Sequence, residues 1–315
     1  MTKPHVLQLG SYPDWDQGPL EASFTMHKYY EATDKAAFLT KVGPEVRAIA
    51  TNGGLGANSA IIAACPKLEI ISVYGVGYDA VDIATTTARG IHVTNTPDVL
   101  TGDVADLAVA MLLMQSRGML AAEHWARSGD WAAKGGFPLM RRVYGQRAGI
   151  LGLGRIGHAV ARRLAAFDMD IAYSAQSPKA DAPDWEYIAD PVALAARSDF
   201  LFVTLAASAA TRHIVNAKVL QALGPQGMII NVSRAANIDE EALLQALTSG
   251  EVGAAALDVF EGEPALDPRF LTLPNVLLQP HIGSGTFETR KAMGQLMRDN
   301  LTAHFAGLPL PTPVL

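Results

Sequence analysis

Three charged side chains in the second half of the chain follow apolar runs that predict strands. They are Arg234 after residues 228–232, Glu263 after residues 254–258 and His281 after residues 276–279. In open α/β sheets the carboxyl ends of the strands face the ligand crevice, so these side chains could reach one site. Arg234 offers a planar fork for a carboxylate, and His281 can donate a proton near neutral pH. A carboxylate such as Glu263 beside the histidine would favour its charged form.

Each of the three also has an ordinary explanation. Arg234 could be a charge at the start of a helix, and Glu263 could be a loop residue before Pro264. His281 could be a hydrogen-bonded histidine at the end of a strand. Taken singly, each side chain is more often structural than catalytic, but their joint occurrence beside a cofactor site favours catalysis.

A glycine motif, GLGRIG at residues 152–157, lies between an apolar run and an apolar-periodic segment that predicts a helix. Between a strand and a helix, this spacing is the dinucleotide-binding fingerprint, and an incidental tight turn is the alternative. The phosphates would bind at the N-terminus of the helix, where free N–H groups and the helix dipole favour anions. The predicted cofactor contacts in this motif are Gly152, Gly154, Arg155, Ile156 and Gly157.

The segment after the next predicted strand bears on which dinucleotide binds. NAD sites carry an acidic residue about twenty residues beyond the glycine motif, where it bonds the ribose hydroxyls. Ser174 occupies that place, and no acidic residue occurs between it and Asp181. The polar side chains that could instead bind the 2′-phosphate of NADP are Ser174, Gln176, Ser177 and Lys179. We predict that NADP(H) is preferred and that NAD(H) is possible, with a plain polar loop as the alternative.

Short apolar runs that predict strands alternate with helical segments along the chain. They are residues 5–9, 48–51, 70–73 and 91–94, and then 148–151, 170–173, 200–205, 228–232, 254–258 and 276–279. Near-continuous apolar strands that alternate with helices imply parallel sheets covered on both faces. The predicted fold is therefore α/β, with two doubly wound Rossmann-like domains, parallel sheets and a cleft between the domains.

The domain boundary is predicted near residues 95–98, where Pro97 ends the preceding element. A last helix over residues 286–305 ends before Gly307, and the prolines that follow forbid more helix. A single helix after the second sheet suggests that the chain returns to the first domain. We predict a substrate-binding domain of residues 1–98 plus 286–315, and a dinucleotide-binding domain of residues 99–285.

The composition limits the classes of partner. The 315 residues are 49% hydrophobic and 18% charged, which predicts a globular protein with more than one core. The formal net charge of −6 argues against nucleic acid or an anionic membrane as the main partner. The single cysteine, Cys65, allows no internal disulfide and fits a reducing compartment. We therefore expect a cytoplasmic protein that binds neither nucleic acid, membrane nor metal.

Residues 121–144 form a poorly periodic stretch that contains Trp125 and Trp131. The stretch is long for a connection inside a compact domain. Packing against a second subunit would explain its aromatic side chains, and a plain surface loop is the alternative. We predict a homodimer.

Over nearly its whole length the chain resembles the D-2-hydroxyacid dehydrogenase family, especially the NADPH-dependent glyoxylate/hydroxypyruvate reductases and the hydroxyphenylpyruvate reductases. The stretches that carry the resemblance are residues 76–79, 95–101, 152–157, 257–261 and 281–286. The resemblance implies that Arg234 binds and polarises a 2-oxo acid. It also implies that Glu263 orients and charges His281, which protonates the carbonyl oxygen as hydride arrives from the cofactor.

The resemblance also implies contacts outside this group of three. The N–H groups of Val76 and Gly77 would hold the substrate carboxylate, and Asp258 would contact the nicotinamide amide. Further implied contacts are Leu205, Val232 and Ser233 for the cofactor and Leu55 and Ser284 for the substrate. The chain departs from the family pattern at Ala235, which replaces a glycine, at residues 205–208, which lack a proline, and at Gln176, which replaces an arginine.

The predicted reaction is the reduction of small 2-oxo acids, such as glyoxylate and hydroxypyruvate, to D-2-hydroxy acids. One alternative is the same chemistry on an aromatic 2-oxo acid such as hydroxyphenylpyruvate, because the glycines of residues 51–56 leave room for a side chain unless Leu55 fills it. A second alternative is a non-catalytic protein that senses NAD(P), like the corepressors that share this fold. The intact set of Arg234, Glu263 and His281 argues for turnover.

Overall fold

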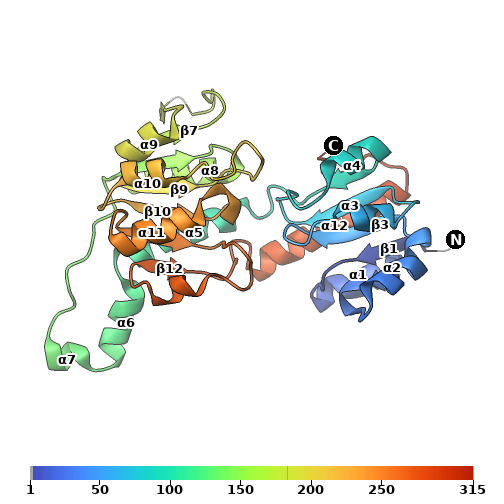
Figure 1. Cartoon of the computed structure of the whole chain (residues 1–315), viewed down its shortest axis with the longest axis horizontal. Coiled ribbons are helices and arrows are strands. Elements are labelled where there is room, and N and C mark those ends of the chain that lie inside the picture. The colour runs from blue at the N-terminus through green and yellow to red at the C-terminus, as the bar shows by residue number, and fades with distance from the viewer. Residues whose placement is uncertain (1–2, 183, 315) are drawn as a thin grey trace. The chain divides into compact units, whose positions relative to one another are not determined.

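The computed structural model describes residues 3–182 and 184–314, and the chain divides into two compact units. Unit 1 comprises residues 1–100 and 286–315, and unit 2 comprises residues 101–285 (Figure 1). The outermost residues of the predicted domain ranges, 1–2 and 315, lie outside the described residues.

Unit 1 is built on a parallel sheet of five strands. The strands are β1 (His5–Gln8), β2 (Thr25–Lys28), β3 (Ala48–Asn52), β4 (Ile70–Tyr74) and β5 (His92–Thr94). The helices are α1 (Asp14–Ser23), α2 (Lys35–Val42), α3 (Ser59–Ala63), α4 (Ile83–Arg89) and α12 (Phe287–Phe305). The sheet has the order β2-β1-β3-β4-β5, so the strand order reverses between β1 and β3. Ligands of open α/β sheets bind outside the carboxyl ends of the strands near such a reversal.

Unit 2 is built on a parallel sheet of seven strands. The strands are β6 (Arg147–Leu151), β7 (Asp170–Ser174), β8 (Glu186–Tyr187), β9 (Phe200–Val203), β10 (Met228–Asn231), β11 (Ala254–Leu257) and β12 (Val276–Leu278). The helices are α5 (Thr101–Ser116), α6 (Met119–Arg127), α7 (Asp130–Lys134), α8 (Arg155–Ala165), α9 (Pro191–Arg197), α10 (Ala217–Leu223) and α11 (Glu240–Ser249). The order is β12-β11-β10-β9-β6-β7-β8, so the reversal lies between β6 and β9.

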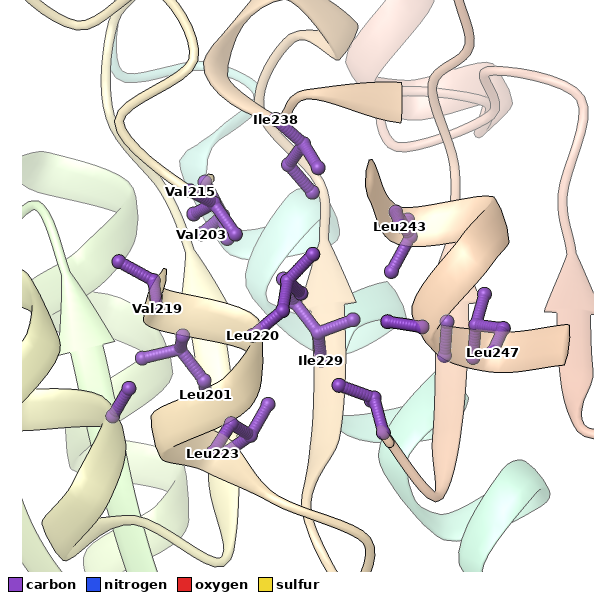
Figure 2. Packing of buried hydrophobic residues seen from close by; sticks show 14 of the residues in the cluster. Leu201, Val203, Val215, Val219, Leu220, Leu223, Ile229, Ile238, Leu243 and Leu247 are labelled. Atoms are coloured by element: carbon purple, nitrogen blue, oxygen red, sulfur yellow. The ribbon is translucent and has the colours of Figure 1, made fainter. Parts of the chain in front are cut away.

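Buried aliphatic side chains hold the helices of unit 2 on its sheet. Figure 2 shows side chains of α10 and α11 packed on those of β9 and β10. The cluster includes Leu201, Val203, Val219, Leu220, Leu223, Ile229, Leu243 and Leu247. Because these side chains are withdrawn from water, they fix the helices and strands whose ends carry the candidate site.

The prediction of two α/β units with parallel sheets is confirmed, and each predicted strand is present. Two strands were missed, β2 and β8. All four residues of β2 are half-buried, and only Met26 among them is apolar, so this edge strand lacks the apolar run that marks an inner strand. The strand β8 has only two residues, too few to show any period.

The interpretation of residues 121–144 as a plain surface loop is wrong for half of the stretch. The helices α6 and α7 occupy residues 119–127 and 130–134, and no residue of either helix is buried. Figure 1 shows them apart from the sheet of unit 2. The two helices have nine and five residues, so neither is long enough to repeat an apolar stripe over several turns, which is why the sequence pattern did not reveal them.

Across residues 3–182 and 184–314, no single helix is long and apolar enough to span a membrane. The helices α5 and α6 pass that test only as a pair, and the pair is bent by 58°.

Candidate active site

The glycine motif forms a tight turn from β6 into α8. Gly152 has a φ of 102°, and a Cβ placed on it would lie 2.8 Å from the side chain of Leu205. A Cβ on Gly157 would lie 2.1 Å from the carbonyl oxygen of Gly152, which also accepts a hydrogen bond from Thr204 Oγ1 at 2.6 Å. Both positions therefore require glycine for the turn itself.

The middle glycine of the motif, Gly154, has a different environment. A Cβ on Gly154 would meet no atom within 4 Å, and this residue lies directly before the first turn of α8. Gly154 and Arg155 are exposed, and Ile156 is half-buried. The N-terminus of an eleven-residue helix beside open space on the glycine side fits the pyrophosphate of a dinucleotide.

The predicted 2′-phosphate ligands lie at and beyond the end of β7. Gln176 and Ser177 are exposed and Lys179 is half-buried. Ser174 is buried, and its hydroxyl donates to the carbonyl oxygen of Ala189 at 3.1 Å. Because the one donor proton of Ser174 is used within the chain, the donors left for a phosphate in this segment are Gln176, Ser177 and Lys179.

A buried polar network lies where β10 ends. The side-chain oxygen of Asn231 accepts hydrogen bonds from the N–H of Ser233 at 3.0 Å and from its hydroxyl at 2.8 Å. The amide of Asn237 donates to the Ser233 hydroxyl at 3.0 Å and to the carbonyl oxygen of Leu205 at 3.0 Å. Val232 and Ser233 are buried, so this network fixes the turn that leads to Arg234.

Asn231 and Asn237 were not among the predicted site residues. The signal for Asn231 is a buried amide at the end of an otherwise apolar run, because such a side chain needs partners. Asn237 gives no comparable signal, since its partners lie on separate loops.

Arg234 is half-buried, and its guanidinium donates to the carbonyl oxygen of Ser233 at 2.8 Å. The positive charge of Arg234 is close enough to Glu263 to lower the pKa of that carboxyl group. The ends of β10 and β11 thus bring a cation and a carboxylate to one place, as the parallel strands require.

Glu263 and His281 are in direct contact. The Nδ1 atom of His281 lies 2.6 Å from Oε2 of Glu263, and Oε1 of Glu263 accepts the N–H of Phe260 at 2.8 Å. Burial alone would raise the pKa of Glu263, but these hydrogen bonds and the positive charges of His281 and Arg234 hold the pKa below its ordinary value. Glu263 is therefore a carboxylate at neutral pH.

Asp258 joins the ends of β11 and β12. Its two carboxylate oxygens accept the N–H groups of Ile282 at 2.7 Å and Gly283 at 2.8 Å. Burial raises the pKa of Asp258, while the two N–H groups and the charge of His281 oppose the rise. The aspartate thereby fixes the main chain next to His281.

The remaining predicted residues lie elsewhere. Leu55, Val76 and Gly77 belong to unit 1, and half-buried Ser284 lies just before α12. Asn52 accepts the N–H of Leu55 at 2.8 Å, and the Leu55 side chain is 53% exposed. In the described part of unit 1, the N–H groups of Val76 and Gly77 have no hydrogen-bond acceptor. The residues after β7 are separated from Arg234 in the sheet by β6 and β9.

Comparison with known proteins gives a consistent result. Residues 109–283 match the family described as D-isomer specific 2-hydroxyacid dehydrogenase, NAD binding domain. Hydroxyphenylpyruvate reductase of Plectranthus scutellarioides is 44% identical over 98% of this chain and 98% of its own length.

Two solved structures are similar over nearly the full length of both chains. A 2-hydroxyacid dehydrogenase of Ketogulonicigenium vulgare Y25 is 70% identical, with a TM-score of 0.94 over 100% of this chain and 99% of its own. The NADPH-dependent glyoxylate/hydroxypyruvate reductase of Sinorhizobium meliloti, solved with NADP and malonate, is 40% identical, with a TM-score of 0.92 over 99% and 97% of the two chains.

Proposed function

The chain belongs to the D-isomer specific 2-hydroxyacid dehydrogenase family, and we propose that it reduces small 2-oxo acids to D-2-hydroxy acids with NADPH. Glyoxylate and hydroxypyruvate are the proposed substrates. The observation that carries this proposal is the contact between His281 and Glu263 at 2.6 Å, with the charge of Arg234 acting on the same carboxylate. Such a group can bind an anionic substrate and supply a proton to it.

His281 is the proposed proton donor. Because Nδ1 faces the Glu263 carboxylate, Nε2 is the atom that can hold a proton toward a substrate oxygen. Glu263 keeps its negative charge because its pKa is lowered, so it can compensate the charge of a protonated imidazole. The bound cofactor supplies the hydride that the carbonyl carbon receives.

Arg234 is the proposed ligand of the 2-oxo acid, and its guanidinium can polarise the carbonyl group. The N–H groups of Val76 and Gly77 are proposed to bind the substrate carboxylate, which is supported by their lack of an acceptor within the described part of unit 1. Leu55 and Ser284 remain proposed substrate contacts. Each carboxylate oxygen of Asp258 can accept a further hydrogen bond, and we propose that the amide group of the nicotinamide donates one to it.

We propose that the glycine turn binds the pyrophosphate and that residues 176–179 bind the 2′-phosphate, so that NADPH is preferred to NADH. The donors Gln176 and Ser177 are exposed, Lys179 adds a positive charge, and the Sinorhizobium relative was solved with NADP. Leu205, Val232 and Ser233 are proposed cofactor contacts because they border the turn or the network beside it. The comparison that tests the preference is kcat/KM for both cofactors at low ionic strength, and equal values would contradict it.

The reaction is tested by following NADPH absorbance with purified protein and hydroxypyruvate, glyoxylate or hydroxyphenylpyruvate. We expect the first two to be reduced with higher kcat/KM than the third. The relative from Plectranthus, a hydroxyphenylpyruvate reductase, keeps the aromatic acid as a second candidate substrate. Reduction of hydroxyphenylpyruvate, but of neither smaller acid, would favour the aromatic substrate. Cofactor binding without any turnover would instead support a sensor of NAD(P) and contradict an enzyme.

We also propose a homodimer that uses the segment around α6 and α7. Large apolar side chains are exposed there: Met119, Leu120, Trp131, Leu139, Met140 and Tyr144. A hollow of about 270 Å³ on the same helices is lined by Ala126, Gly129, Trp131 and Ala132. Exposed apolar surface of this kind is typical of an interface. Light scattering after size exclusion tests the proposal, and a monomeric mass at micromolar concentration would contradict it.

A cytoplasmic location is proposed because NADPH is an intracellular reductant and because the single cysteine, Cys65, is buried and unpaired. Cell fractionation with an antibody to the protein tests this location, and recovery outside the cytoplasm would contradict it.

A further inference from the structure

The segment from Ala175 to Ala182 follows β7 and contains no helix or strand of its own. It carries Gln176, Ser177 and Lys179, the proposed ligands of the 2′-phosphate. The affinity of such a segment for a phosphate depends on how well its main chain is held, because an unfixed loop must be ordered when the ligand binds. The groups that hold this main chain therefore bear on cofactor choice without any contact to the cofactor.

Tyr173 is one of these groups. It lies in β7, is 1% exposed, and is paired with Ile150 of β6 and Tyr187 of β8. Its hydroxyl oxygen accepts the main-chain N–H of Lys179 at 2.7 Å. A rigid strand residue thus ties down the loop at the residue that carries its positive charge.

Two other side chains hold the loop near its ends. The hydroxyl of Tyr187 donates to the carbonyl oxygen of Ala175 at 3.2 Å, and Nε2 of His158 lies 3.3 Å from the carbonyl oxygen of Asp181. The rings of Tyr173 and Tyr187 are in contact, with centroids 5.5 Å apart. Between these ends, the bond from Lys179 to Tyr173 holds the middle of the loop against the sheet.

We propose that the Tyr173 hydroxyl is a positioning group that sets the preference for NADPH over NADH. The proposal rests on the proposed binding of the 2′-phosphate by residues 176–179. Without the hydroxyl, the main chain at Lys179 loses its anchor to β7, and the cation and hydroxyl donors of the loop are no longer held together. NADPH then loses affinity because it needs these donors, whereas NADH has no 2′-phosphate to be held.

The test is Tyr173→Phe, which removes one oxygen and keeps the buried ring. Isothermal titration gives Kd for NADP⁺ and NAD⁺ with the wild type and the variant. The loss of one hydrogen bond is expected to raise Kd for NADP⁺ by about threefold to tenfold, with Kd for NAD⁺ changed by less than about twofold. The matched control is Tyr30→Phe, the same chemical change on a half-buried ring of unit 1, and it is expected to change neither value.

A double-mutant cycle with Lys179→Met shows whether Tyr173 acts through Lys179. If it does, Tyr173→Phe has a smaller effect on NADP⁺ binding in the Lys179→Met background than in the wild type. If Tyr173→Phe does not fold, Tyr187→Phe removes the hydroxyl of β8 that holds the same loop, and it is expected to weaken NADP⁺ binding selectively, by a smaller factor.

The outcomes separate this proposal from the function on which it rests. A wild-type protein that binds NADP⁺ and NAD⁺ equally would overturn the cofactor preference and this proposal with it. A clear wild-type preference that Tyr173→Phe leaves intact would overturn only the role of Tyr173. An equal loss of affinity for NADP⁺ and NAD⁺ would also overturn the role of Tyr173, because a merely structural defect weakens the binding of both cofactors.

Discussion

At the scale of single residues, Glu263 is held at both carboxylate oxygens, by the Phe260 N–H and by His281. His281 itself has a φ of 54°, in the left-handed region that residues other than glycine rarely adopt. A non-glycine residue in this conformation at a candidate site is an observation that points to function. Glu263 and the main-chain bend together hold the imidazole in one orientation.

The first prediction concerns His281→Asn. Asparagine tolerates the left-handed conformation better than most residues, so the main chain should keep its path. It cannot donate a proton as an acid, so kcat should fall by about a hundredfold to ten-thousandfold, the usual cost of losing a general acid. Steady-state kinetics with hydroxypyruvate and NADPH measure the change.

The control for His281→Asn is the Kd for NADP⁺, which should stay within about twofold of the wild-type value because the substitution is distant from the glycine turn in the order of strands. Turnover within about threefold of the wild type would show that another group supplies the proton.

At the scale of elements, the turn from β6 into α8 gives a prediction with its own control. Gly157→Ala places a methyl group 2.1 Å from the Gly152 carbonyl oxygen, so the turn must open. Overpacking of this kind costs about 1–3 kcal/mol, and both the unfolding midpoint and NADP⁺ affinity should fall. Gly154→Ala places its methyl group where no atom lies within 4 Å, so the unfolding midpoint should stay unchanged. Because the methyl group enters the space proposed for the pyrophosphate, the affinity for NADP⁺ should fall.

Thermal unfolding and NADP⁺ titration of the two variants check this contrast. If Gly154→Ala bound NADP⁺ as the wild type does, the pyrophosphate would not lie against this glycine. If Gly157→Ala kept its stability, the close approach of α8 to β6 would not depend on glycine.

The sequence predicted the inner strands because their burial on both faces requires apolar runs. It could not predict β2, whose Thr25 and Lys28 lie at the sheet edge and need not be apolar. It also missed the helices α6 and α7, because none of their side chains is buried within the chain. Apolar runs report burial, so an edge strand and short exposed helices give a weaker signal than strands that are buried on both faces.

The candidate site was predictable to the extent that parallel strands bring their carboxyl ends to one edge of a sheet. That rule grouped Arg234, Glu263 and His281, and the contact between the last two measures 2.6 Å. Their roles, like those of the cofactor contacts, stay predictions. The hydrogen bond from Lys179 to Tyr173 could not be predicted, because it depends on the path of a loop that has no periodicity.

At the scale of the whole chain, each unit has an ion cluster at the starting ends of its strands. In unit 1, Arg47 forms two hydrogen bonds with Glu69 just before β3 and β4, at 2.7 and 2.9 Å. In unit 2, Arg147 at the start of β6 donates to Asp199, which precedes β9, at 3.0 and 3.2 Å. The candidate ligand sites lie at the opposite ends of the strands, so these clusters serve stability rather than chemistry.

The cluster in unit 2 makes stability depend on pH. Burial would raise the pKa of Asp199, but hydrogen bonds from Arg147 and the charges of Arg147 and Arg141 hold the pKa below its ordinary value. A carboxyl group whose pKa is lower in the folded state stabilises the fold above its unfolded pKa, near 4. That stabilisation is lost as the pH falls through the folded pKa.

Asp199→Asn tests this dependence. At neutral pH the free energy of unfolding of the variant should be lower than that of the wild type by on the order of 1 kcal/mol. The loss is small because Arg147 is half-exposed and water screens the ion pair. As the pH falls through the folded pKa of Asp199, the carboxyl group becomes protonated in both states and the gap to the wild type should close. Urea unfolding midpoints at neutral pH and at low pH measure the gap. Glu123→Gln, which removes an exposed partner of Arg127 on α6, is the control and should change neither midpoint. A gap that persists at low pH would mean that Asp199 stabilises the fold through its shape rather than its charge.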